Sequence, residues 1–427
     1  MSHPQQSQDT EQVARRDPHG EGLFSENDSE SSWWRVVSSQ PVTYDVRIVE
    51  GVLDRTQPAL ARAGTTERTG GRRLIVIESF VHTLYGHVLE RYLRAWGLTA
   101  EVLVLLAGEQ AKTMDSVHTV TRHLDGLEIA RRHEPIIAIG GGVLLDVVGM
   151  AASLYRRSTP YVRVPTTLIG LVDAGVGVKT GVNFDNHKNR LGTYYAPSTC
   201  LLDPSFLRSL DERHISNGLA EILKIALVKD YRLFTLLERH GGRLVTSRLQ
   251  PERNDSTVAR EVLERAIGGM LEELAPNLWE KELHRLVDYG HSFSPTIEMD
   301  ALPDLLHGEA VCIDMALTTA IAHGRGLVGD EDYRRIMATI ETLRLPAYHP
   351  ICTVERLGAA LADTVRHRDG AQRLPLPVGI GSARFVDDVT VAEIGTALDR
   401  LATATTGPAR EPEAREPEAR EQRSPAR

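Results

Sequence analysis

Three uninterrupted apolar runs constrain the fold of this chain more than any other feature. They lie at 74–77, 102–106 and 136–139. Segments of helical length, roughly 82–96 and 114–132, separate them. A strand that is buried on both faces is apolar throughout rather than alternating, so these runs predict a parallel sheet covered by helices on both faces. Residues 43–49 alternate in polarity and predict a further strand.

The periodicity changes near residue 210, after which the apolar period is helical almost throughout. This change predicts a Rossmann-like α/β domain at 33–210 and a mostly α-helical domain at 211–404, with the active site between them. The first 32 residues are polar, and the chain from about residue 405 carries Glu-Pro-Glu-Ala-Arg twice. Neither end has enough apolar residues for a core, so 1–32 and 405–427 are expected to be disordered tails.

Composition excludes several classes of protein. The chain has 427 residues and a net charge of −9, which argues against nonspecific binding to nucleic acid. It contains no apolar run of about 18 residues and no hydrophobic signal core, so we expect no membrane segment and a cytoplasmic location. Cys200, Cys312 and Cys352 are far apart and form no CxxC pair, as expected for reduced, buried thiols.

A mostly apolar segment at 218–230 is predicted to be a buried helix, with Ser216 or Asn217 as its N-cap. Glu221 and Lys224 are three residues apart and therefore share one face of this helix. Burying an unpaired charge costs several kcal/mol, so both side chains need partners. The simplest interpretation is an ion pair between the two.

A metal site is the second interpretation of the same helix. Two histidines follow downstream, His291 in Tyr-Gly-His-Ser and His307 in Leu-His-Gly-Glu. One glutamate and two histidines are the ligands of a catalytic zinc whose fourth position stays open to substrate. Sequence spacing alone does not decide between this set and the ion pair.

A glycine triplet at 140–142 joins the third apolar run to a predicted helix. Glycines let the backbone approach a pyrophosphate, and the amides of a helix N-terminus can bind it. A tight turn without a ligand has the same composition, but polar residues after the neighbouring strands favour nucleotide binding. The candidate cofactor-binding residues are Glu78, Glu109, Lys112, Gly141, Gly142, Asp146, Thr166 and Thr167. Glu78 ends a strand, where a carboxylate can accept from ribose hydroxyls.

Charged and amide side chains crowd the glycine-rich stretch 173–190. Such composition is usual for a surface loop, yet apolar residues surround Asp173 and Lys179, as expected for the lining of a cleft. Lys188 and Asn189, with Arg157 upstream, would suit a phosphate group.

Taken together, these motifs resemble the sugar phosphate cyclase superfamily, which contains 3-dehydroquinate synthase. The likeness covers about residues 43–400. It rests on Gly-Glu-x-x-Lys at 108–112, Gly-Gly-Gly-x-x-x-Asp at 140–146, Pro-Thr-Thr at 165–167, Asp173 with Lys179, Lys188-Asn189, Ala-Glu-Ile-Leu-Lys at 220–224, Gly-His at 290–291 and His-Gly-Glu at 307–309. The resemblance implies an NAD-binding α/β domain, a helical metal domain and a homodimer. It implies NAD+ and zinc, or cobalt in its place, as cofactors, with Glu221, His291 and His307 as metal ligands.

The resemblance also assigns roles to single residues. Those implied in catalysis are Asp173, Lys179, Lys224, Asp288 and His367. Those implied in substrate and phosphate binding are Arg157, Lys188, Asn189, Lys224, Asp288 and His367. Arg157 would reach the phosphate from the other subunit.

Departures from dehydroquinate synthase indicate the branch. Its carboxylate-binding arginine corresponds to His284, a nearby asparagine to Asp288, and a second histidine to Pro295. A carboxylate pocket would thus have lost a cation and gained an anion. This favours the neutral sugar phosphate sedoheptulose 7-phosphate, and Asp288 with His367 resembles the 2-epi-5-epi-valiolone synthase branch.

The implied reaction is a transient NAD-dependent oxidation, elimination of phosphate, reduction and an intramolecular aldol closure, as used in C7-cyclitol (aminocyclitol) biosynthesis. Alternatives within the superfamily are 2-epi-valiolone synthase, desmethyl-4-deoxygadusol synthase and 3-dehydroquinate synthase. A zinc- and NAD-dependent polyol dehydrogenase and a catalytically inactive sugar-phosphate-binding protein are alternatives from other functional classes.

Overall fold

The computed structural model describes residues 21–27, 32–64, 72–106, 108–185, 187–251 and 257–405. The chain divides into two compact units, Met1–Thr43 and Tyr44–Arg427. In the first, β1 (Gly22–Asn27) pairs antiparallel with β2 (Ser32–Val37). The expectation that all of 1–32 is disordered is therefore wrong for β1. This segment is ordered because its backbone forms hydrogen bonds with β2. Residues 1–20 and 406–427, which cover most of both expected tails, lie outside the described residues.

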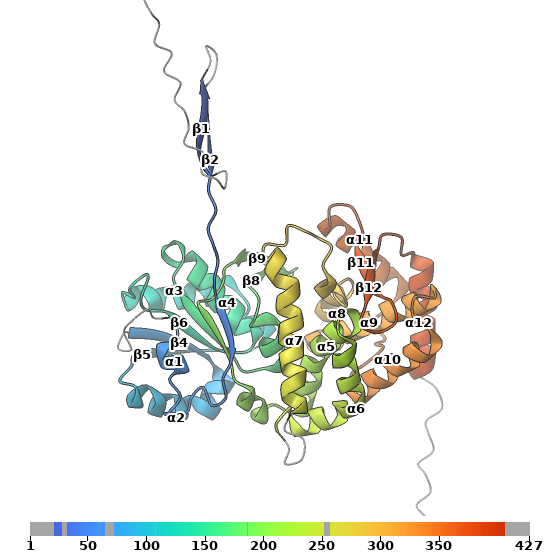
Figure 1. The fold of residues 1–427 in the computed structure, drawn as a ribbon, viewed down its shortest axis with the longest axis horizontal. Helices are drawn as coiled ribbons and strands as arrows, with labels where there is room; N and C mark the ends of the chain where they lie inside the picture. The colour runs from blue at the N-terminus through green and yellow to red at the C-terminus, as the bar shows by residue number, and fades with distance from the viewer. Residues whose placement is uncertain are drawn as a thin grey trace, which may run out of the picture. The chain divides into compact units, whose positions relative to one another are not determined.

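A six-stranded parallel sheet forms the first half of the larger unit, in the order β3-β10-β7-β6-β4-β5 (Figure 1). Its strands are β3 (Asp45–Ile48), β4 (Arg72–Glu78), β5 (Thr99–Leu105), β6 (Ile136–Gly140), β7 (Tyr161–Pro165) and β10 (Thr199–Leu202). The three apolar runs fall on β4, β5 and β6, which confirms the predicted parallel sheet.

Helices cover both faces of this sheet. They are α1 (Ala59–Arg62), α2 (Ser79–Ala95), α3 (Met114–Gly126) and α4 (Gly142–Leu154). Ile75 and Ile77 pack with residues of α1 and α2, whereas Leu74 and Val76 pack with residues of α3 and α4. Successive side chains of a strand point to opposite faces, which is why β4 had to be apolar throughout.

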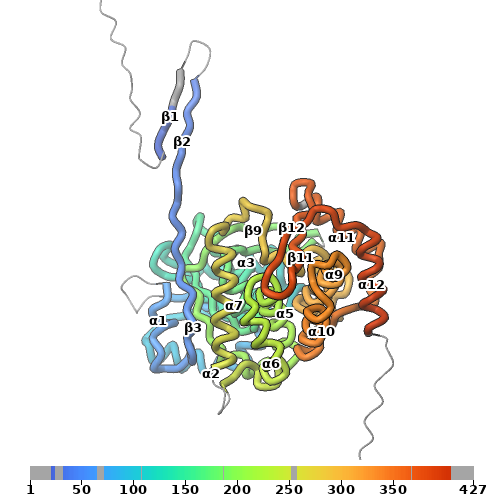
Figure 2. The backbone as a smooth tube through the Cα atoms, turned by 45° about the vertical axis from the view of Figure 1, so that its right-hand side comes forward, coloured from blue at the N-terminus to red at the C-terminus, as the bar shows by residue number. Residues whose placement is uncertain are grey.

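The second half is mostly helical, as predicted. After the antiparallel hairpin β8 (Lys179–Phe184) and β9 (His187–Tyr194) come α5 (Glu212–Val228), α6 (Tyr231–Ser247), α7 (Val258–Leu274), α8 (Ser294–Asp300), α9 (His307–Gly324), α10 (Asp330–Thr342), α11 (Val354–His367) and α12 (Val391–Thr405). A small hairpin, β11 (Leu374–Pro377) and β12 (Ala383–Val386), interrupts them. Figure 2 shows α5, α6 and α7 side by side, and their apolar residues belong to the largest buried cluster. Both halves lie within one compact unit.

The central helix α5 begins earlier than expected. Asp211 is its N-cap and accepts a hydrogen bond from the His214 backbone N–H at 2.8 Å. Ser216 and Asn217, the expected caps, are buried inside the helix. The helix gains a turn because Asp211 offers a capping carboxylate ahead of the apolar stretch.

The three cysteines are buried free thiols, in agreement with the sequence. Within the described part of the chain, no helix combines the length and apolarity that a bilayer crossing requires.

Candidate active site

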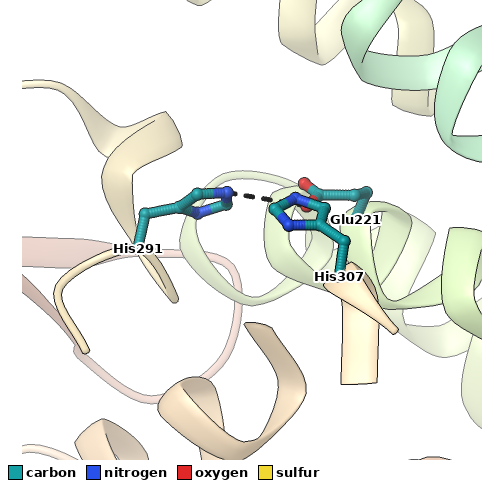
Figure 3. A group of neighbouring side chains, drawn as sticks. All are labelled: Glu221, His291 and His307. Carbon is teal, nitrogen blue, oxygen red and sulfur yellow. Dashed lines mark ion pairs between the residues drawn. The ribbon is translucent and has the colours of Figure 1, made fainter. Parts of the chain in front are cut away.

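Three side chains from separate segments converge on one point (Figure 3). Glu221 comes from α5, His291 from the loop before α8, and His307 is the first residue of α9. Glu221 Oε1 lies 3.3 Å from His307 Nε2 and 3.6 Å from His291 Nε2. A tetrahedral zinc with ligands at about 2.0–2.1 Å places its ligand atoms about 3.3 Å apart. The spacing of this cluster therefore fits zinc.

Hydrogen bonds fix which histidine nitrogens face the cluster. His307 Nδ1 lies 2.9 Å from Glu298 Oε2, and His291 Nδ1 lies 3.1 Å from the Tyr289 carbonyl oxygen. Both partners are acceptors, so each Nδ1 carries the proton and each Nε2 is left for a metal ion. Glu221 is 1% exposed, and its Oε1, which faces both histidine Nε2 atoms, accepts no hydrogen bond. A divalent cation at this point would satisfy that buried oxygen.

The ion pair expected from the sequence is present beside this cluster. Lys224 Nζ lies 2.5 Å from Glu221 Oε2, and both side chains are buried. Burial alone would favour neutral Glu221, but Lys224 and His291 hold its pKa well below the ordinary value. Burial likewise opposes a charged Lys224, whose pKa is nevertheless raised by Glu221. The predicted ion pair is therefore present, and the same glutamate belongs to the cluster whose spacing fits zinc.

Close docking of α9 on α5 brings the ligands together. The Gly308 backbone N–H donates to Asn217 Oδ1 at 2.6 Å. A Cβ at Gly308 would lie only 1.9 Å from the Asn217 carbonyl oxygen. Arg213 of α5 holds Glu309 of α9 through two hydrogen bonds of 2.7 Å. The glycine between His307 and Glu309 is thus required by helix packing.

The glycine triplet forms the expected turn between β6 and α4. Gly141 is the N-cap of α4 and provides no side-chain cap, so the amides that open the helix remain available. The Gly141 backbone N–H donates to Glu78 Oε2 at 2.9 Å, and the Thr166 N–H donates to the Gly140 carbonyl at 3.0 Å. A Cβ at Gly141 would come within 3.2 Å of the Thr167 side chain. This narrow, uncapped turn fits the pyrophosphate of a dinucleotide.

Lys112 links the glycine turn to the β8–β9 hairpin. The residue is 4% exposed, and its ammonium lies 2.7 Å from Asp146 on α4 and 2.5 Å from Asn189 Oδ1 on β9. Burial opposes its charge, but Asp146 and Glu109 outweigh burial and raise the pKa of Lys112. Glu109 accepts a hydrogen bond from Asn183 at 2.8 Å. The structure thus brings these predicted cofactor and phosphate residues into one network.

Glu298 is a site residue that the sequence reasoning missed. Its Oε1 lies 2.5 Å from Lys188 Nζ, and its Oε2 accepts from His307. Burial would raise the pKa of Glu298, but His307 and Lys188 lower it strongly. One carboxylate thus joins a predicted phosphate ligand to a predicted metal ligand. Its signal in the sequence was an acidic residue between Ile297 and Met299, because a charge among apolar neighbours needs partners.

Asp288, the anion that the sequence places in the substrate pocket, is paired with two arginines. Asp288 ends the short helix η6 (Leu286–Asp288) and is 9% exposed. Its Oδ2 accepts from Arg285 Nε at 3.2 Å and lies 3.5 Å from Arg368 Nη2. Two guanidinium groups therefore neutralise the carboxylate. Sequence comparison at His284 and Asp288 alone could not show this, because Arg368 arrives from the end of α11.

Lys179 lies at the start of β8 and forms an ion pair with Glu280, which also pairs with Arg285. Its side chain is 58% exposed, yet burial by surrounding protein and the charge of Arg285 lower the pKa of Lys179 to about 8. The Lys179 side chain is thus reachable from solvent while charged residues surround it. Asp173, in the helical turn η3 (Gly170–Ala174), acts electrostatically on both Lys179 and Lys224.

Two predicted residues are not placed with the others. Arg157 is exposed in η2 (Tyr155–Arg157), after the C-terminal end of α4, whereas the glycine turn opens that helix. A helix of this length spans about 20 Å, so Arg157 lies far from the glycine turn of the same chain. His367 is the last residue of α11, and its side chain lies outside the described part of the structure.

Comparison with known proteins agrees with this geometry. Residues 102–217 match the family profile "3-dehydroquinate synthase N-terminal", and residues 218–364 match "3-dehydroquinate synthase C-terminal". A 2-epi-5-epi-valiolone synthase from Actinomyces sp is 60% identical over 370 residues, which cover 86% of this chain and 97% of that protein. A 3-dehydroquinate synthase from Synechococcus sp. (strain CC9605) is 34% identical over 359 residues, covering 84% of this chain and 95% of that protein.

A solved structure gives the same result. ValA, the 2-epi-5-epi-valiolone synthase from Streptomyces hygroscopicus subsp. jinggangensis 5008 with NAD+ and Zn2+ bound, superimposes with a TM-score of 0.83. It is 55% identical, and the match covers 87% of this chain and 100% of that one. With its Glu-His-His cluster, glycine turn and two matched halves, the chain belongs to the 3-dehydroquinate synthase family of sugar phosphate cyclases.

Proposed function

We propose that this protein is a 2-epi-5-epi-valiolone synthase that converts sedoheptulose 7-phosphate to 2-epi-5-epi-valiolone and phosphate, with NAD+ and zinc as cofactors. The observation that carries the proposal is the 60% identity to an enzyme of that name over 97% of its length. The buried Glu221, His291 and His307 cluster supports it. Elimination of phosphate with carbon–carbon bond formation would make the enzyme a carbon–oxygen lyase of cyclitol biosynthesis.

The residues of the cluster would hold zinc through Glu221 Oε1 and the two histidine Nε2 atoms. When bound, zinc polarises the hydroxyl that is oxidised, and the nicotinamide accepts and later returns the hydride. Lys224, beside Glu221, would place a positive charge next to the reacting hydroxyl. Lys179 is crowded by protein yet reachable from solvent, so we assign proton transfer to it, with Asp173 as its neighbouring carboxylate.

Lys188 and Asn189 are the proposed phosphate ligands within the chain. Glu298 occupies one donor of the Lys188 ammonium, and an ammonium has three, so two donors remain for phosphate oxygens. Arg157 would contribute from a second subunit, which makes a homodimer part of the proposal. Asp288, held by Arg285 and Arg368, would present a fixed acceptor to a substrate hydroxyl, and His367 would contact the substrate beside it.

The test is incubation of the zinc-loaded protein with sedoheptulose 7-phosphate and NAD+. We expect release of phosphate, no net accumulation of NADH, and 2-epi-5-epi-valiolone as the product identified by NMR. The sister cyclases would release phosphate with a different cyclitol. A polyol dehydrogenase would accumulate NADH, and an inactive binding protein would form no product. Any of these three results would refute the proposal.

A further inference from the structure

Asp314 ties the loop that carries His291 to the helix that begins with His307. It lies in α9 and is fully buried, at 0% exposure. Its Oδ2 accepts hydrogen bonds from the backbone N–H groups of Phe293 at 2.6 Å and Ser294 at 2.9 Å. One carboxylate oxygen therefore binds the chain two and three residues beyond a predicted zinc ligand.

The loop is also linked to α9 by Tyr289, whose Oη lies 2.7 Å from Thr319 Oγ1 and 3.2 Å from the Met315 carbonyl oxygen. The loop lies between η6 and α8, so no regular backbone ladder fixes the position of its residues. Thr364 of α11 donates to the Ser292 carbonyl at 2.7 Å, which holds the outer side of the loop. At Gly290, φ is +73° and a Cβ would come within 2.8 Å of Met315. The loop is thus pressed against α9, and Asp314 is the α9 side chain that binds its backbone beyond His291.

The chemistry of the contact suits a positioning role. An ionised carboxylate that accepts from backbone N–H groups forms hydrogen bonds roughly twice as strong as neutral ones. Burial raises the pKa of Asp314 to about 6, while the amides of Phe293 and Ser294 favour its charged form, so the group is ionised at neutral pH. A catalytic metal site depends on ligands held to within about 0.5 Å, and His307 is already fixed by α9.

We propose that Asp314 is a positioning residue of the zinc site, which sets the distance between His291 and the Glu221–His307 pair by anchoring the 291–294 loop to α9. The inference rests on the zinc site of the proposed function. Asp314 touches neither metal nor substrate in this arrangement, and it acts through the backbone of Phe293 and Ser294.

The experiment compares Asp314→Ala and Asp314→Asn with Cys312→Ala, a buried substitution two residues away on the same helix. Zinc affinity is measured by competition with a chromophoric chelator, NAD+ affinity by calorimetry, and the melting temperature on metal-free protein. Asp314→Ala should weaken zinc binding about 10- to 100-fold. Asp314→Asn keeps an acceptor oxygen and should stay within about fivefold of the unmodified protein. Cys312→Ala should leave zinc affinity unchanged, and NAD+ affinity should be unchanged in all three.

Unchanged zinc affinity in Asp314→Ala would overturn the proposal, as would equal losses of zinc affinity in Asp314→Ala and Cys312→Ala. If the unmodified protein binds one zinc ion but forms no cyclitol, the proposed cyclase function is wrong. The zinc affinities of the variants then still test the role of Asp314. If the unmodified protein binds no zinc, the metal site itself is wrong and the inference fails with it.

Discussion

Replacement of Gly308 by alanine should separate α9 from α5 and damage the zinc site without touching a ligand. The added Cβ would lie 1.9 Å from the Asn217 carbonyl oxygen and 2.8 Å from its carbonyl carbon, whereas real Cβ contacts essentially never fall below 3.0 Å. The helices must therefore move apart by about 1.1 Å at this point. Backbone atoms block the methyl group, so no side-chain rotation relieves the overlap.

The shift acts directly on the ligand distances. His307, the neighbour of Gly308, has its Nε2 3.3 Å from Glu221 Oε1, already the separation of about 3.3 Å that tetrahedral zinc requires. An added 1 Å exceeds the tolerance of about 0.5 Å for a working site. We expect zinc affinity to fall by at least tenfold and stability to fall by about 1–3 kcal/mol, the usual cost of overpacking.

The matched control is Gly324→Ala at the other end of α9, where an added Cβ meets nothing within 4 Å. That change should leave zinc affinity intact and be neutral or stabilising by up to about 1 kcal/mol. Zinc affinity by chelator competition, thermal unfolding and phosphate release are measured for both variants. Zinc binding and activity at the unmodified level in Gly308→Ala would refute the packing argument.

Four further outcomes are expected. His307→Ala should abolish zinc binding and turnover while the fold persists, since two ligands hold zinc poorly; activity of the metal-free variant would contradict this. Glu298→Gln should weaken zinc binding about 10- to 100-fold and raise KM, measured by phosphate release, because a predicted phosphate-binding lysine loses its counter-ion. Asp288→Asn removes the carboxylate that Arg285 and Arg368 share, and should raise kcat/KM for a heptulosonate phosphate relative to sedoheptulose 7-phosphate by about tenfold; an unchanged ratio would exclude a charge effect. Hydrogen bonds from Arg325 lower the pKa of Glu393 to about 2 from 4.5. The stabilisation of the fold by this pair is therefore complete above pH 4.5 and is lost as the pH falls toward 2. In denaturant titrations, Glu393→Gln should lower the free energy of unfolding by about 1 kcal/mol at pH 7 and leave it unchanged near pH 2.

Sequence periodicity determined the sheet and the helices because it depends only on neighbouring residues. The run at 136–139 is apolar throughout since β6 is covered on both faces, and the glycine triplet follows because the backbone turns sharply into α4. The Glu221–Lys224 ion pair was also predictable, because residues three apart on a helix must share a face. The strand that begins at Gly22 was not predicted from the sequence. A strand this short is stable only when it pairs with another segment, and local periodicity does not show that pairing.

The zinc ligands could be named from motifs, but their meeting depends on tertiary packing. The residues around Glu221 do not specify how closely α9 packs on α5. That close approach requires a glycine at position 308, because a Cβ there would overlap the backbone of α5. The partners of Asp288 could not be predicted for the same reason, because Arg368 lies 80 residues after it in the sequence yet pairs with its carboxylate in the fold. The sequence by itself determined which elements form and which side chains need partners, because both follow from short-range pattern and desolvation. Only the tertiary structure decided which partners they receive, since the pairing of buried charges depends on how distant segments pack.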